Sequence, residues 1–279
     1  EVVPFGAAGY DALSRVVGEL KRDDPMRSVT VVVPTNLVGL QSRRHLALGI
    51  NGRDGIAALT VTTLPRLAEQ IASARMGGRR PMTRAVLTSA FRSVITTDAG
   101  AFDKVADHPA TLRALVQAHR ALRDLSDQAH EDTALAAPLT AEVVAISDRV
   151  RASLTADWYD ERDLIDAATR AVLDGTQRST EPLVLMLPER LTAPEQEFVR
   201  ALGSEVEVTV LHASSGSPRG DAAVAAPFST FAETSDSPTS SPAAVSTVLH
   251  ASDADDEVRF VVRHVVEELQ KTRADRIAV

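Results

Sequence analysis

The chain opens with Val2-Val3-Pro4-Phe5-Gly6-Ala7-Ala8-Gly9-Tyr10-Asp11, in which a short apolar run leads through a glycine-containing turn into a helical pattern. The expected helix carries apolar side chains at helical spacing, which predicts one buried face. These side chains are Leu13, Val16, Val17 and Leu20. A strand that passes through a short turn into a helix is the unit from which parallel α/β sheets are built.

The same strand–turn–helix order is the place of the phosphate-binding loop in nucleotide hydrolases. A working loop needs a lysine that reaches the β- and γ-phosphates, and a Ser or Thr hydroxyl on magnesium. Here Gly6 and Gly9 remain, Tyr10 and Asp11 occupy the region of that pair, and the first lysine is Lys21. The segment is therefore either a degenerate nucleotide loop or an ordinary turn whose glycines only permit the backbone to turn.

Similar units follow along the chain. Residues 29–34 form a nearly continuous β-branched run, as expected for a parallel strand that is buried on both faces. Thr35 and Asn36 are cap candidates for the next helix. Further strands are expected at 59–63, 183–187 and 206–211, and further helices at 64–74, 157–173 and 192–202. This alternation predicts a parallel α/β core formed by residues 1–76 and 157–212.

Residues 77–156 break the alternation, because only helical periodicity is found there. Helices are expected at 83–96, 110–126 and 140–154. We interpret this block as an all-helical insertion in the α/β core.

The C-terminal part of the chain begins with a segment rich in Ser, Pro, Thr, Ala and Gly, which predicts a flexible loop over 213–247. A short strand is expected to start at Val248, and Asp253 is expected to cap a final helix. Arg276 to Val279 resemble the opening of another strand. We therefore expect 248–279 to be the start of a second, truncated α/β domain, and the chain to be an N-terminal fragment.

Composition limits the functional classes. The sequence has no cysteine, which excludes disulfides and thiolate metal sites and fits a reducing cytoplasm. No run of about 18 apolar residues is present, so no membrane span is expected. The formal net charge of −8 argues against a protein that coats nucleic acid non-specifically, although a narrow basic groove remains compatible with it.

No convincing catalytic or metal site emerges from residue spacing. The seven histidines are scattered, without the spacing of metal ligands. Asp160 and Asp163 lie one helical turn apart and could hold a cation. We favour the alternative that they lie in the first turn of a helix, where the macrodipole favours carboxylates.

The order of the weak motifs resembles the N-terminal part of a UvrD/RecB-type superfamily 1 helicase, and is closest to the degenerate AddB-like subunits of helicase–nucleases. Residues 6–11 fall where that family has its phosphate loop, and 31–36 resemble the strand ending in Thr-Asn. Residues 61–67 resemble the segment that contacts single-stranded DNA, with Pro65 in place of a histidine. Residues 159–164 resemble the Tyr-Asp-x-x-Asp-Leu element at the exit of the inserted domain.

The resemblance implies a RecA-like core that has lost its nucleotide chemistry. Pro188 stands where the family has the aspartate of its magnesium-binding Asp-Glu pair, so Pro188 and Glu189 form a degenerate metal motif. Candidate DNA contacts are Thr35, Asn36, Arg43, Arg44, Thr63 and Arg66. No cofactor is expected in this fragment. The implied partners are DNA and a motor helicase subunit, in the cytoplasm, and the relatives carry a nuclease domain beyond the region that matches this chain.

Three interpretations stay open. In the first, the chain is an ATPase-inactive helicase-like module that serves as scaffold or DNA guide. In the second, it is an active ATP-dependent helicase with an unusual phosphate loop, which would bind ATP and Mg²⁺. In the third, it is an unrelated two-domain α/β protein that binds a small ligand at the carboxyl ends of its strands.

Overall fold

The structure is a computed structural model that describes residues 1–4, 6–49, 55–176, 181–215, 217–231 and 250–277. The chain divides into two compact units, Glu1–Thr239 and Ser240–Val279, which are described separately. None of the helices in these described segments is both long and apolar enough to cross a membrane.

The first unit is built on a five-stranded sheet whose four pairings are all parallel, as the sequence predicts. The strand order is β1-β7-β6-β2-β3. The strands are β1 (Val2–Pro4), β2 (Val29–Val32), β3 (Leu59–Thr62), β6 (Leu183–Met186) and β7 (Val208–Ser214). All residues of β2 and β6 are buried, because helices cover both faces of the sheet.

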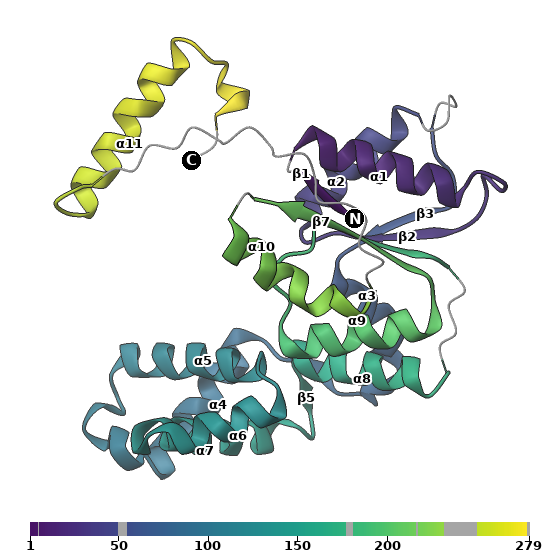
Figure 1. Cartoon of the computed structure of the whole chain (residues 1–279). Coiled ribbons are helices and arrows are strands. Elements are labelled where there is room, and N and C mark those ends of the chain that lie inside the picture. Colours follow the sequence, from purple (N-terminus) through teal and green to yellow (C-terminus); the bar gives the residue numbers. More distant parts are fainter. Residues whose placement is uncertain (5, 50–54, 177–180, 216, 232–249, 278–279) are drawn as a thin grey trace. The chain divides into compact units, whose positions relative to one another are not determined.

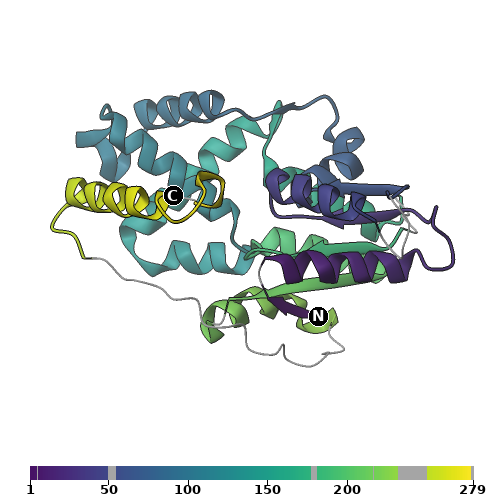
Figure 2. The same ribbon diagram turned by 90° about the horizontal axis from the view of Figure 1, so that it is seen from above.

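One face of the sheet is covered by α1 (Ala7–Leu20) and α2 (Asn36–Ala47), which lie side by side (Figures 1 and 2). The predicted face of α1 is buried here, and Leu13 and Val17 are fully inaccessible to solvent. The opposite face is covered by α3 (Leu64–Ala72), α8 (Glu161–Leu173) and α9 (Ala193–Glu205) (Figure 1). Phe198 of α9 is a fully buried side chain of this second core.

The connections reverse direction between β2 and β6. The chain leaves β2 through α2 towards β3, and it leaves β6 through α9 in the opposite direction towards β7. Because α2 and α9 lie on opposite faces, the loops that follow β2 and β6 diverge at the carboxyl edge of the sheet. Such a divergence is the usual position of a ligand crevice in open α/β sheets.

Residues 85–155, all of which the structure describes, contain no strand. They hold most of α4 (Arg84–Thr97) together with η2 (Gly100–Val105), α5 (Pro109–Arg123), α6 (Asp127–Ala136) and α7 (Pro138–Leu154). These helices have their own apolar core around Phe91 and Ile146. The helix expected at 110–126 is wrong at its end, because α5 stops at Arg123 and Ser126 caps α6 by accepting a hydrogen bond from Ala129 N.

Two short strands connect this helical block to the sheet. After η1 (Ser73–Met76), β4 (Arg80–Pro81) pairs in parallel with β5 (Trp158–Tyr159). The predicted helix at 157–173 therefore starts later, at Glu161, because Trp158 and Tyr159 are held by β4. Neither strand was expected from the sequence.

The segment expected to be a loop over 213–247 is partly regular. β7 starts at Val208, two residues later than expected, because Val206 is the C-cap residue of α9. The strand continues to Ser214, beyond its expected end. α10 (Pro218–Ala225) and η3 (Ala226–Phe231) follow. Phe228 is buried in the same core as Phe198 of α9. This contact holds the segment against the rest of the first unit, although its Ser/Pro-rich composition predicts a loop. Residues 232–247 lie outside the described part of the chain.

The second unit contains α11 (Ala254–Leu269) and η4 (Ala274–Arg276). Asp253 caps α11 as predicted, by accepting a hydrogen bond from Asp256 N at 2.8 Å. The strand expected at Val248 lies outside the described residues. A strand was expected to begin at Arg276, but Arg276 is the last residue of η4. Residues 278–279 lie outside the described residues.

Candidate binding site at the carboxyl edge of the sheet

The turn between β1 and α1 is very short. β1 ends at Pro4 and α1 begins at Ala7, so Phe5 and Gly6 are the whole connection. Gly6 has φ 89° and ψ −140°, a region that is essentially restricted to glycine, and Gly9 N donates to Gly6 O at 3.1 Å. A phosphate loop needs several residues between its glycines to surround an anion with backbone N–H groups. This connection has no such length.

The two side chains at the place of the Lys-Ser/Thr pair are engaged with α2. Asp11 Oδ1 lies 3.3 Å from His45 Nε2, which makes an ion pair when His45 is protonated. The rings of Tyr10 and His45 lie 5.6 Å apart between centroids. These contacts pack α1 against α2 and explain both residues without a ligand.

Leu187 fills the space beside the glycine turn. It follows β6 with φ 50°, an uncommon conformation for a branched residue, and its N–H donates to Leu211 O at 2.8 Å. A Cβ atom added to Gly9 would lie 3.5 Å from both methyl groups of Leu187. The structure therefore brings the turn from Gly6 to Gly9 against the residue that precedes Pro188. This contact could not be predicted from the sequence, because it joins positions far apart in the chain.

Pro188 and Glu189 line a pocket of about 160 Å³ at the carboxyl edge, where the loops after β2 and β6 diverge. Its walls are largely apolar, with Glu189, Arg190 and Glu195 as the charged members. The other lining residues are Val32, Val33, Pro34, Leu64, Pro65, Leu185, Met186, Leu191 and Val199.

Four of the candidate DNA contacts gather at the same edge. β2 and β3 pair with Val32 opposite Thr62, so the residues that follow both strands are neighbours. Thr35 caps α2 by accepting a hydrogen bond from Val38 N at 3.3 Å, and Asn36 is the first residue of that helix. Thr63 occupies the N-cap position of α3, and Arg66 is exposed and pairs with Glu69 at 3.0 Å.

Arg43 and Arg44 lie further along α2 and differ from each other. The Arg43 guanidinium donates to Val61 O at 2.8 Å, so it is tied to the backbone of β3. Arg44 is exposed and has no ion pair with any described residue. The structure therefore leaves Arg44 the freer of the two.

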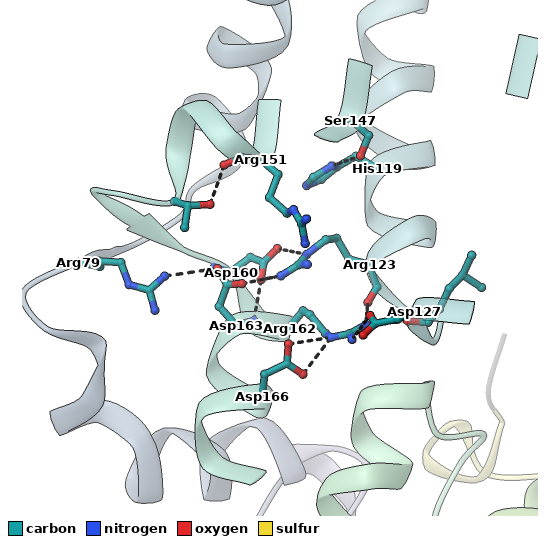
Figure 3. Close-up of polar contacts among 12 residues, drawn as sticks. Arg79, His119, Arg123, Asp127, Ser147, Arg151, Asp160, Arg162, Asp163 and Asp166 are labelled. Carbon is teal, nitrogen blue, oxygen red and sulfur yellow. Dashed lines mark hydrogen bonds and ion pairs between the residues drawn. The ribbon is translucent and has the colours of Figure 1, made fainter. Parts of the chain in front are cut away.

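A partly buried ionic network joins the helical block to α8 (Figure 3). The Arg123 guanidinium, at the end of α5, donates to Asp160 at 2.7 and 2.8 Å and to Asp163 at 2.6 Å. Asp160 and Asp163 also form a capping box at the start of α8. Of the two interpretations of this acidic pair, the helix-start interpretation is therefore correct, and the cation that it holds is the guanidinium of Arg123.

Arg162 extends the network on the other side. Its side chain is 13% exposed and donates to Asp166, to Asp127 and to the backbone oxygens of Arg123 and Leu125 (Figure 3). Burial raises the pKa of Asp160, but hydrogen bonds and charge from Arg123 outweigh burial and lower that pKa overall. Burial dominates at Asp166 and raises its pKa despite Arg162.

A second pocket, of about 490 Å³, lies between α5 and the first turns of α8 and α9. Burial and the nearby Glu195 raise the pKa values of Asp124 and Glu161, which face this pocket. His119 is buried beside it and shares a 2.7 Å hydrogen bond with Ser147. Burial lowers the pKa of His119 to about 4, so the ring is neutral at pH 7. The described residues contain no group of three or more His, Cys, Asp or Glu side chains that could hold a metal ion.

Comparison with known proteins gives no assignment: no protein-family profile matches the chain, and no curated protein matches it.

Proposed function

We propose that this chain is a helicase-like module without ATP chemistry, which acts as a scaffold or DNA guide in a DNA repair or recombination helicase–nuclease. In this proposal the α/β core corresponds to the RecA-like motor domain of the family that the sequence resembles, and the helical block corresponds to its inserted domain. The proposed location is the cytoplasm, and the proposed partners are DNA and a motor helicase subunit.

The observation that carries the proposal is the connection from β1 to α1. Only Phe5 and Gly6 separate the two elements, and Asp11 is paired with His45. Backbone N–H groups in a longer loop and a lysine are what hold the phosphates of a bound nucleotide in this family of sites. This chain has neither the longer loop nor the lysine, and the residues at those positions make packing contacts between α1 and α2 instead.

The position of the metal motif supports the same proposal. Pro188 has no side-chain oxygen with which to bind Mg²⁺, and Leu187 packs against Gly9 beside it. Nucleotide and metal chemistry would both be missing from one edge of the sheet. The exposed polar residues after β2 and β3, and Arg44 further along α2, remain available for a phosphate backbone.

Equilibrium binding of the chain to a fluorescent single-stranded oligonucleotide tests the proposal. We expect binding that weakens with salt and that Mg-ATP leaves unchanged, because a module without a nucleotide site has no way to couple the two ligands. An Arg44→Gln/Arg66→Gln variant, called the edge variant, should bind more weakly. A DNA affinity that Mg-ATP shifts several-fold would overturn the ATP-independent role.

The pocket of about 160 Å³ beside Pro188 favours a second candidate, the binding of a small apolar ligand at the carboxyl edge. Its position after β2 and β6 is where open α/β sheets bind ligands. Its volume is below the roughly 300–1,000 Å³ typical of sites for cofactors and drug-sized ligands, so only a fragment-sized group would fit. A Val199→Phe variant, which should fill this pocket, would abolish such binding and leave DNA binding intact.

A further inference from the structure

The arginines of this chain are unevenly distributed. Residues 70–97 contain five arginines and neither aspartate nor glutamate, although the whole chain has a formal net charge of −8. This segment runs from the end of α3 through η1 and β4 into α4. The positive charge is therefore concentrated on the connection between the α/β core and the helical block.

Part of this segment forms a groove against α8. A hollow of about 390 Å³ is lined by Arg75, Met76, Arg79, Ala167 and Arg170. All three of its charged lining residues are arginines. Asp174 pairs with Arg75 and Asp163 pairs with Arg79, but neither carboxylate is among the residues that line the groove.

The three side chains are held in place and still have donors to offer. Arg75 donates to Asp174 at 3.1 Å and to Thr176 at 2.5 Å. Arg79 lies 3.8 Å from Asp163, a contact that Figure 3 includes. Arg170 donates through Nε to the backbone oxygen of Asp166 at 3.2 Å. Its two terminal nitrogens have no protein acceptor within the described segments. A fixed guanidinium with free N–H groups is suited to bind phosphate oxygens in pairs.

The positive surface continues beyond the groove. The Arg80 guanidinium lies 4.4 Å over the ring of Trp158, and Arg84 is exposed at the first position of α4. A cation at the N-terminus of a helix is disfavoured by the macrodipole, so an anion nearby would relieve this arrangement. A run of guanidinium groups along an extended connection fits a ligand that carries a row of negative charges.

We propose that the groove formed by Arg75, Arg79 and Arg170 binds the phosphodiester backbone of a nucleic acid strand. The inference rests on the proposed function for the class of ligand, but it adds a site on the α3–α8 layer that is distinct from the candidate contacts at the carboxyl edge. Arginine pairs with phosphate more specifically than lysine does, and Lys21, Lys104 and Lys271 are the only lysines in the sequence.

Fluorescence anisotropy of a labelled single-stranded oligonucleotide with the whole chain tests this site. The groove variant is Arg75→Gln/Arg79→Gln/Arg170→Gln. The control variant, Arg113→Gln/Arg200→Gln/Arg263→Gln, removes the same charge from exposed positions elsewhere. We expect the groove variant to bind at least about tenfold more weakly near 50 mM salt, and the salt slope of log K to fall by about 0.7 for each arginine lost, as expected for single strands. The control variant should retain wild-type binding.

Each outcome has a separate meaning. Equal DNA binding by the groove and control variants would contradict the proposal that the groove binds DNA. Loss of binding in the edge variant alone would also reject the groove as a DNA site, but it would leave the proposed function unchanged. No binding by the wild-type chain at low salt overturns both. Displacement of the oligonucleotide by polyglutamate at matched charge concentration would assign the groove to an acidic protein instead. If the groove variant does not fold, Arg170→Gln alone decides, because the terminal nitrogens of that side chain support no other described residue.

Discussion

The Arg123 network gives the most quantitative prediction about this fold. Replacing Arg123 by Met removes a guanidinium that is 14% exposed and that donates three hydrogen bonds to Asp160 and Asp163. Asp160 is then left largely buried without its cation, and Asp163 keeps only the longer, 3.8 Å contact with Arg79. Removing one partner of a buried ion pair costs about 3–5 kcal/mol, and the partial exposure of the two carboxylates places the expected loss near 3 kcal/mol.

Urea denaturation at pH 7 measures this loss as a change in the free energy of unfolding. Arg113→Met is the matched control, since Arg113 lies exposed on the same helix α5 and should change stability by less than about 0.5 kcal/mol. Asp160→Asn provides the second half of a double-mutant cycle, because asparagine is as good an N-cap as aspartate. We expect a coupling of about 2 kcal/mol between the two positions.

The pH dependence of the same variant provides an independent test. In the wild-type protein Arg123 lowers the pKa of Asp160, so this stabilisation is present above the unfolded pKa and is lost as pH falls through the folded pKa. In Arg123→Met burial, the largest influence on the pKa of Asp160, is opposed only by the hydrogen bond from Asp163 N and by charge from His119. The pKa of Asp160 should therefore be higher in the variant than in the wild type, and protonation of Asp160 at low pH should remove part of the cost of burying its charge. The difference in the free energy of unfolding between wild type and variant should therefore become smaller as pH falls. A loss below about 1 kcal/mol at pH 7, which is typical of an exposed ion pair, would refute the reasoning.

Three further predictions follow from single residues. Burial lowers the pKa of His119 to about 4. The protein should therefore lose about 2 kcal/mol of its free energy of unfolding as pH falls from 7 to 5, and urea midpoints measured for His119→Gln should not show this loss. Gly6→Ala should cost about 1–3 kcal/mol because φ 89° with ψ −140° strains any side chain, and a thermal midpoint equal to wild type would contradict the observed turn. Leu13→Ala should lower the free energy of unfolding by about 2–5 kcal/mol in urea denaturation, because the side chain is fully buried. A loss as small as that at an exposed position would mean that α1 does not pack on the sheet as described.

The parallel core could be predicted because its strands are buried on both faces. Runs such as Val29–Val33 must then be continuously apolar or β-branched, and this is visible in one short window. The capping box of Thr192 and Glu195 could also be predicted, because its two residues are only three positions apart, and the structure contains it. Boundaries were less certain where two elements compete, as at Val206 between α9 and β7.

The rest of the site depends on contacts between distant positions. Arg123 and Asp160 are 37 residues apart, so the sequence shows an acidic pair but not the guanidinium that it binds. The contact of Leu187 with Gly9 joins two turns that are far apart in the sequence but adjacent in the fold. β4 and β5 are two residues each, too short for any period to reveal. Such features require the fold before they can be seen.

The central claim is that the carboxyl edge of this sheet has lost its nucleotide chemistry. Calorimetric titration of the chain with Mg-ATP tests it most directly, and the Asp11→Lys variant should be titrated in parallel. The account predicts no measurable binding by either protein, because the short turn after β1 and Pro188 remain unchanged when a lysine is restored. A micromolar dissociation constant for the wild-type chain, or ATP hydrolysis by Asp11→Lys, would contradict it.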